Sequence, residues 1–176
     1  MERKILQPGQ ILVPGEYKLG NEGILKIYFR IFDSGHGDDL PLSIVINRNL
    51  ATEGALESFV DQDRAQRIYS EIEQSGADYF LIDGNHKTVA AALCHVAPNV
   101  LELETNQDLE EARKMVVRGK LFDFPHKKDD LIKIADSFVE FVFRKDYVRT
   151  LPQRVDELTS NGDLPQYMKE RYHRGK

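Results

Sequence analysis

The residues whose types and spacing best suit chemistry lie in one short segment, Asp83-Gly-Asn-His-Lys-Thr88. An apolar run of strand length, 79–82, precedes the segment, and the alanine-rich stretch 88–94 that follows is typical of a helix. Glycine breaks the apolar run, and asparagine is a favourable helix N-cap. We therefore predict a strand, a tight turn at Gly84 and a helix capped by Asn85.

This arrangement places His86 and Lys87 in the first helical turn, where exposed backbone N–H groups and the helix dipole are already positive. Two basic side chains are unfavourable there unless an anion lies against them, and helix N-termini readily bind phosphate. Asp83, at the strand end, would point at the same spot and could hold a metal ion or an acceptor hydroxyl. The alternative interpretation is an ordinary turn aspartate followed by two solvated basic side chains.

Composition indicates an ordinary globular protein. A chain of 176 residues fits one domain, or one domain with a helical appendage, and can bury a real core. We recognise neither a signal peptide nor a membrane helix, so we expect no membrane partner. The single cysteine, Cys94, excludes an internal disulfide and a cysteine-based zinc cluster. It predicts a packed thiol and a reducing, cytoplasmic setting.

The charge balance weighs against nucleic acid as the partner. The net charge is −5 and the pI is near 5.6, whereas nucleic-acid-binding domains usually carry a basic footprint. Residues 144–176 carry eight basic and five acidic side chains. This excess is weak and is more typical of a solvated tail than of a DNA-binding surface.

Hydrophobic periodicity predicts an α+β fold with strands early in the chain and helices late. Residues 25–32 alternate with Leu25, Ile27, Phe29 and Ile31 on one face, which predicts a strand. Further strands are expected over 41–47, 79–82 and 100–103. Helices are expected over about 53–75, from 105 or 106 to 118, and over about 129–147, with short elements after Pro152. The polar loop 33–39 contains His36 and three aspartates, which could ligate a metal ion. The interpretation that we favour is a flexible hairpin connection.

The unit formed by a strand, Asp83-Gly84-Asn85-His86-Lys87 and a helix resembles the nucleotide-binding motif of the ParB/sulfiredoxin superfamily. Within that superfamily it is most similar to ParB-like proteins of the branch that contains ADP-dependent free serine kinases. The segment Val13-Pro-Gly-Glu16 resembles an early family segment, and the run 112–122 followed by Pro125-His-Lys-Lys128 resembles a family helix and basic loop. The resemblance covers roughly residues 11–131.

The resemblance implies a ParB/sulfiredoxin-like domain over 1–125, with a small mixed sheet packed by helices, and a C-terminal helical extension over 126–176 packed on it. It implies ADP or ATP with Mg²⁺ as cofactors, and phosphoryl transfer to the hydroxyl of a small molecule such as free serine. Glu16 would be the catalytic base. Nucleotide phosphates would be held by Gly84, Asn85, His86, Lys87 and Thr88, with His126 and Lys127 as a second clamp, and Asp83 would act in catalysis and hold the metal.

Departures from the family pattern narrow the reaction. Sulfiredoxins carry a reactive cysteine where this chain has Asn85, so sulfinic-acid repair is not expected. Chromosome-partitioning ParB proteins have a Gly-Glu-Arg-Arg box and a helix-turn-helix domain, neither of which is recognisable here. The serine-kinase branch usually has arginine at Lys87, and lysine binds phosphate as a point charge instead of a planar fork. A ParB-like nucleic-acid-binding protein or nuclease, and a nucleotide-binding regulator without turnover, remain alternatives.

Overall fold

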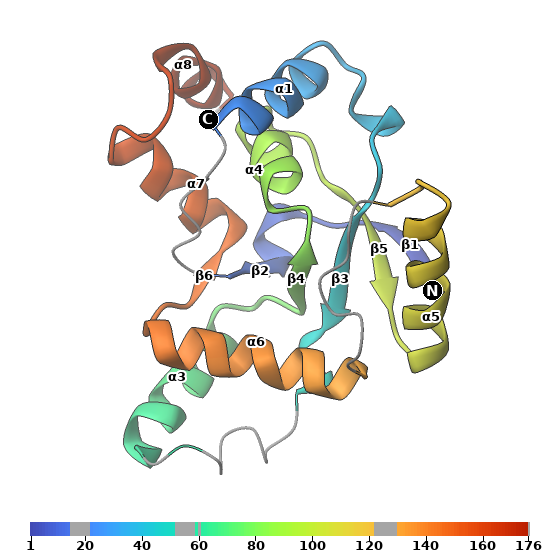
Figure 1. Cartoon of the computed structure of the whole chain (residues 1–176). Coiled ribbons are helices and arrows are strands. Elements are labelled where there is room, and N and C mark those ends of the chain that lie inside the picture. The colour runs from blue at the N-terminus through green and yellow to red at the C-terminus, as the bar shows by residue number, and fades with distance from the viewer. Residues whose placement is uncertain (15–21, 52–58, 60, 122–129, 176) are drawn as a thin grey trace.

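The computed structural model describes residues 1–14, 22–51, 59, 61–121 and 130–175 (Figure 1). The strands are β1 Glu2–Ile5, β2 Ile11–Val13, β3 Ser43–Asn47, β4 Tyr79–Asp83, β5 Asn99–Leu103 and β6 Arg149–Thr150. The α-helices are α1 Glu22–Asp33, α3 Gln62–Gln74, α4 Asn85–Leu93, α5 Asn106–Val117, α6 Leu131–Lys145, α7 Leu151–Ser160 and α8 Gln166–Arg174. Short 3₁₀ turns cover Pro8–Gln10, Gly37–Asp39 and Arg48–Leu50.

The six strands form one mixed sheet in the order β1-β5-β3-β4-β2-β6. Parallel pairing joins β5 to β3 and β4 to β2, whereas the other neighbouring strands pair antiparallel. In the β2–β4 pair, Ile11 lies opposite Tyr79 and Leu12 opposite Phe80. Because β2 and β4 are parallel, their carboxyl ends lie at the same edge of the sheet. This edge carries the Asp83 turn.

Helices cover both faces of the sheet, with α1, α4, α7 and α8 on one side and α3 and α6 on the other (Figure 1). Neighbouring side chains of β4 point to opposite faces of the sheet. Leu81 packs in the layer of α1, α4, α7 and α8, and Phe80 packs in the layer of α3 and α6. Phe80 stacks on Phe138 of α6 with ring centroids 4.3 Å apart. The result is a mixed α/β architecture, which is consistent with the predicted α+β class.

Several sequence predictions are confirmed. Strands form at 43–47, 79–83 and 99–103, and helices form at 106–117 and 131–145. Thr105 caps α5, its side chain accepting from the Asp108 amide at 3.2 Å. Gly119, at φ +69°, follows the helix where a stop was expected. Cys94 is buried as predicted, with Sγ 3.8 Å from the Phe29 carbonyl oxygen.

The predicted strand over residues 25–32 is wrong, because the segment is helical in α1. Its buried side chains are Leu25 and Phe29, four residues apart, and they pack against the α4 side of the sheet. Ile27 is 60% exposed, which the alternating pattern does not allow. Bulky apolar residues occupy almost every position of this run, so the run fits both the two-residue period of a strand and the 3.6-residue period of a helix. Packing on the alanine-rich α4 favours the helix.

The predicted helix over about 53–75 is also corrected. Helix α3 begins at Gln62, and its N-cap is Asp61, whose side chain accepts from the Arg64 amide at 3.0 Å. Phe59 and Asp61 are not helical, so no continuous helix runs from 53 to 75. Aspartate competes with helical backbone bonding in mid-helix but stabilises a helix start, which places the boundary here. Gly76, at φ +66°, lies just beyond the end of α3, as predicted.

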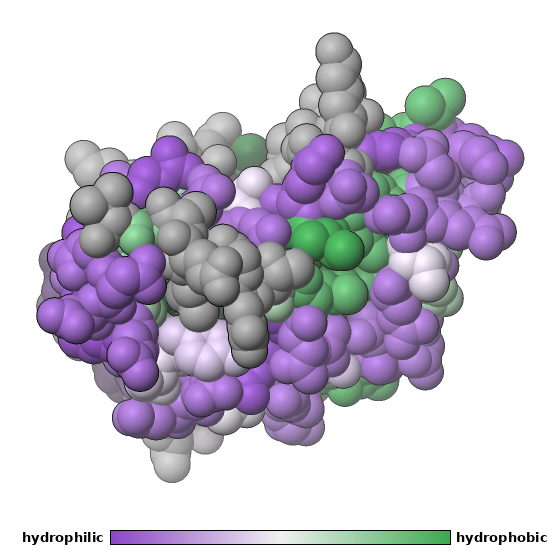
Figure 2. Space-filling view, turned by 90° about the horizontal axis from the view of Figure 1, so that it is seen from below, coloured by the Kyte–Doolittle hydropathy of each residue, from purple (hydrophilic) through white to green (hydrophobic). Residues whose placement is uncertain are grey.

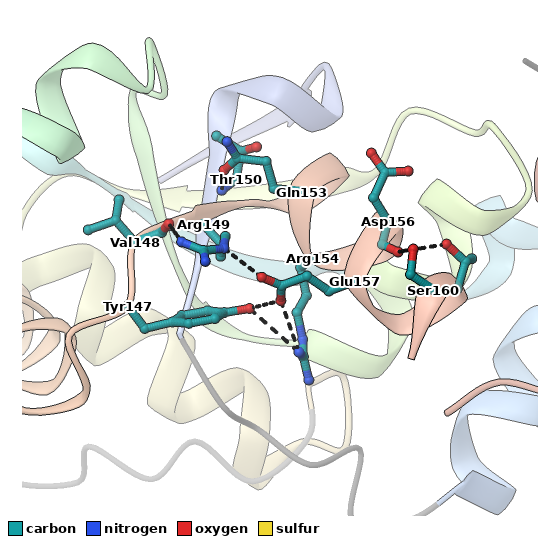
Figure 3. Close-up of polar contacts among 10 residues, drawn as sticks. Tyr147, Val148, Arg149, Thr150, Gln153, Arg154, Asp156, Glu157 and Ser160 are labelled. Carbon is teal, nitrogen blue, oxygen red and sulfur yellow. Dashed lines mark hydrogen bonds and ion pairs between the residues drawn. The ribbon is translucent and has the colours of Figure 1, made fainter. Parts of the chain in front are cut away.

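The C-terminal segment joins the same sheet and both apolar layers. Strand β6 pairs with β2, so that Arg149 lies opposite Val13. Next to this pairing a polar network surrounds Glu157 of α7 (Figure 3). Glu157 accepts from the Tyr147 hydroxyl, from Arg149 Nε at 2.6 Å and from Arg154 at 3.4 Å. Burial and this carboxylate raise the pKa of Tyr147 to about 12. The predicted domain boundary at 125 falls outside the described residues and stays a prediction.

Polar side chains cover most of the face seen from below in Figure 1, with apolar atoms gathered in a smaller area (Figure 2). This distribution fits helices that turn their apolar sides toward the sheet. Among the helices that the structure describes, none combines the length and the apolar character needed to cross a membrane.

Candidate functional site

A pocket of about 350 Å³ lies at the sheet edge where β2 and β4 end. Pro14, directly after β2, and Asp83, the last residue of β4, both line it. Helix α1 contributes a wall through Ile24 and Tyr28. The remaining lining residues belong to β4, to the turn and to the start of α4, namely Leu81, Ile82, Gly84, Asn85, His86 and Lys87. Crevices at the carboxyl ends of strands are the common ligand sites of open α/β sheets.

Glycine is required at position 84 for two separate reasons. Its φ of +94° lies in the left-handed region, which side chains other than glycine's disfavour. A Cβ at this position would also lie 2.3 Å from Ser43 Oγ and 2.7 Å from Ser43 Cβ. The turn therefore packs directly on β3, and this close contact fixes the direction in which α4 leaves the sheet.

The N-cap of α4 is Gly84, not Asn85 as predicted, and Asn85 is the first helical residue. The left-handed glycine completes the turn one residue earlier than the capping preference of asparagine suggested. The first backbone bond of the helix runs from the Thr88 amide to the Gly84 carbonyl oxygen at 2.9 Å. The amides of the first helical turn point out of the helix at its N-terminal end, so this end is electropositive.

Asn85 and His86 each carry a buried polar atom without a hydrogen-bond partner among the described residues. These atoms are Asn85 Oδ1 and His86 Nε2. Burial lowers the pKa of His86 below its usual value, because the low-dielectric surroundings disfavour the imidazolium. Buried polar atoms are normally paired, so two unpaired ones beside a pocket are typical of a binding site.

Asp83 and Tyr28 line the pocket from different elements, β4 and α1. Asp83 is half-buried at the end of β4, and among the described residues that line the pocket it is the one carboxylate. Burial, with a smaller contribution from the negative charge of Asp83, raises the pKa of the half-buried Tyr28 phenol. Sequence reasoning missed Tyr28, because the strand prediction for 25–32 placed it on the opposite face from Leu25 and Phe29.

Lys87 is placed differently from the prediction of a phosphate ligand. The residue is only 4% exposed, and its ammonium donates to the carbonyl oxygens of Pro41 at 2.7 Å and Leu42 at 2.9 Å. Burial lowers the pKa of Lys87 to about 8, although the charge of Asp83 opposes the shift. In this position the lysine ties α4 to the segment before β3 and stiffens the wall of the pocket.

Thr88, also predicted to bind the nucleotide, is 1% exposed and directs its hydroxyl into the helix. The hydroxyl lies 3.2 Å from the Gly84 carbonyl oxygen and 3.1 Å from that of Asn85. The predicted base Glu16 and the predicted clamp residues His126 and Lys127 lie outside the described residues. Their roles stay predictions.

We compared the chain with protein-family models, with curated proteins and with solved structures. None of the three comparisons finds a match.

A second polar cluster lies at the other end of the sheet, on β1 and β5. Glu2, Glu102 and Glu104 bring carboxylate oxygens close enough to share a cation. The ammonium of Lys4 already pairs with Glu102 and lies 3.3 Å from Glu2. Glu102, with smaller contributions from Tyr79 and Glu2, raises the pKa of Lys4, so a cationic side chain of the protein itself already lies within the cluster.

Arginines near the C-terminus are engaged by acidic partners. Arg171 Nε lies 2.7 Å from an Asp33 carboxylate oxygen, and Arg149 and Arg154 both contact Glu157. Ion pairs of this kind remove much of the local positive potential that phosphate backbones require. The weak basic excess noted in residues 144–176 therefore does not form an uncompensated patch at these positions.

Proposed function

We propose that the pocket at the start of α4 binds the phosphates of a nucleotide and transfers a phosphoryl group to the hydroxyl of a small molecule. The observation that carries the proposal is the junction of β4 and α4. There the N-terminal turn of a helix and the carboxylate residue Asp83 line one pocket of about 350 Å³, together with Asn85 and His86, each of which holds a buried polar atom without a partner among the described residues. Such a volume suits a small organic ligand.

Phosphate binding follows from the charges at the helix start. The amides of 85–87 donate hydrogen bonds along the helix dipole, and His86 supplies a further donor from its buried ring nitrogen. A phosphate beside His86 would stabilise the imidazolium, which burial alone disfavours. Lys87 would contribute chiefly by holding the wall of the pocket in place, because its ammonium donates to the carbonyl oxygens of Pro41 and Leu42.

The chain also offers oxygen ligands that fit a magnesium ion. Mg²⁺ in phosphoryl-transfer sites is held by one or two carboxylates together with phosphate oxygens and water. Asp83 supplies such a carboxylate, and the unpaired Asn85 Oδ1 is a neutral oxygen beside it. When bound, the ion would neutralise charge on the transferring phosphoryl group.

Phosphoryl transfer needs a group that accepts the hydroxyl proton and positions the acceptor. Asp83, which lines the pocket, would orient the acceptor hydroxyl. Glu16, which lies outside the described residues, remains the proposed base on sequence grounds.

We further propose that the chain is a distant member of the ParB/sulfiredoxin superfamily, in its serine-kinase branch. The β4–turn–α4 unit and its position in a mixed sheet support this assignment. The close packing of Ser43 on Gly84 and the burial of Lys87 are features that the motif alone did not predict.

The experiment combines purified protein with Mg²⁺, ADP or ATP and a panel of hydroxyl amino acids, serine first, and follows products by ³¹P NMR. We expect a phosphomonoester signal that depends on both nucleotide and acceptor, and that is lost in Asp83→Asn. Absence of any transfer, combined with salt-dependent DNA binding, would instead favour the nucleic-acid-binding alternative.

A further inference from the structure

The pocket that carries the proposed function has two chemically different halves. The start of α4 and Asp83 form the polar half, whereas Pro14, Ile24, Tyr28, Leu81 and Ile82 form an apolar half. The volume of about 350 Å³ is that of roughly ten water molecules. A phosphate ion alone would fill only a fraction of this space and would leave the apolar half in contact with water.

Tyr28 is the side chain of the apolar half that is best suited to a planar ligand. It is half-buried on α1, which packs against α4, and it lines the same pocket as Asp83 and the start of α4. Its hydroxyl has no hydrogen bond, and its ring no aromatic contact, among the described residues. Phe29, the next residue, is by contrast almost fully buried and packs edge-on against Tyr167 at 5.5 Å.

We infer that the α1 wall, through Tyr28 and Ile24, holds the base of the nucleotide, with the phosphates at the start of α4. Aromatic side chains bind nucleobases by stacking, and an aliphatic neighbour such as Ile24 adds apolar contact to the same surface. The assignment rests on the proposed function and adds the orientation of the ligand in the pocket. It makes Tyr28 a residue that recognises the nucleoside part and not the phosphates.

The test separates the two halves of the ligand by calorimetric titration. Magnesium ADP and magnesium pyrophosphate are each titrated into the wild-type protein, Tyr28→Leu and Tyr28→Phe. Tyr69→Leu, which changes an exposed tyrosine of α3, is the matched control. We expect Tyr28→Leu to lower the affinity for ADP about tenfold, which is in the range expected for the loss of one stacking contact. The affinity of this variant for pyrophosphate should stay within about twofold of the wild-type value. Tyr28→Phe and Tyr69→Leu should leave both affinities within about twofold.

Four results overturn the inference. An unchanged ADP affinity in Tyr28→Leu removes the base from this wall while leaving the proposed function intact. Weaker pyrophosphate binding in Tyr28→Phe shows that the hydroxyl contacts phosphate instead. If Tyr28→Leu does not fold, the wild-type protein still decides, since equal affinity for ADP and pyrophosphate would mean that the base makes no contact. Failure of the wild-type protein to bind either ligand refutes the proposed function together with the inference.

Discussion

Replacing Gly84 with alanine tests the geometry of the β4–α4 turn on which the site depends. The backbone there has φ +94°, and an alanine in a left-handed conformation costs about 1–2 kcal/mol. The added Cβ would also lie 2.3 Å from Ser43 Oγ and 3.1 Å from Lys87 Cε. Relieving such overpacking typically costs about 1–3 kcal/mol. We therefore expect Gly84→Ala to lower the free energy of unfolding by about 2–5 kcal/mol.

Urea unfolding followed by circular dichroism measures this change, with Gly162→Ala as the matched control. Gly162 also has a positive φ, of +80°, but a Cβ there would meet nothing within 4 Å. Gly162→Ala is destabilised by the left-handed backbone conformation alone. The difference in free energy of unfolding between the two variants therefore measures the steric contribution at Gly84. If Gly84→Ala costs no more than Gly162→Ala, the close contact with Ser43 is refuted.

A rescue series sharpens the same reasoning. Ser43→Gly in the Gly84→Ala background removes both contacts with Ser43, whereas Ser43→Ala leaves the Cβ that lies at 2.7 Å. In a double-mutant cycle, Ser43→Gly should recover more of the lost free energy than Ser43→Ala. Equal recovery by the two substitutions would show that alanine's Cβ does not meet the Ser43 Cβ.

Three further predictions concern the charged groups of the pocket. Asp83→Asn should slow phosphoryl transfer at least about 100-fold while nucleotide affinity stays within about threefold, as measured by single-turnover kinetics and calorimetry. His86→Ala should weaken phosphate binding. In the wild-type protein the affinity for phosphate should rise as the pH falls from about 7.5 to 5.5, because burial disfavours the imidazolium of His86 and a bound anion stabilises it. In His86→Ala this pH dependence of the affinity should be weaker. The folded-state pKa of Lys87, about 8, lies below the unfolded value of 10.5. Its neutral form is therefore favoured by folding, so stability should rise by about 2–4 kcal/mol between pH 8 and 10.5 relative to Lys87→Met, measured by urea unfolding.

The sequence predicts best where local chemistry and packing agree. The apolar run before Asp83 is a strand because its residues alternate between two apolar layers, and Thr105 starts a helix because its side chain caps it. The segment 25–32 fails because its apolar residues fit a strand and a helix equally well. Only the tertiary contact between Leu25, Phe29 and the α4 side of the sheet decides between them.

The site shows the same division between local and long-range information. Gly84 predicts the turn, and the alanine-rich run 88–94 predicts the helix whose positive N-terminal end carries His86. The direction of the Lys87 side chain is not, because its partners are the carbonyl oxygens of Pro41 and Leu42, more than forty residues earlier in the chain. Tyr28 was missed for a related reason, since its place in the pocket follows from the helix that the alternation concealed.

The measurement that tests the central claim most directly is a titration of ¹⁵N-labelled protein with magnesium ADP, followed through the backbone amide signals. Phosphates bound at the start of α4 should produce the largest and saturable shifts at the amides of Asn85, His86 and Lys87, and His86→Ala should weaken that titration. If these amides stay unmoved while signals elsewhere shift, or if no signal responds, the phosphate site at the β4–α4 turn is contradicted.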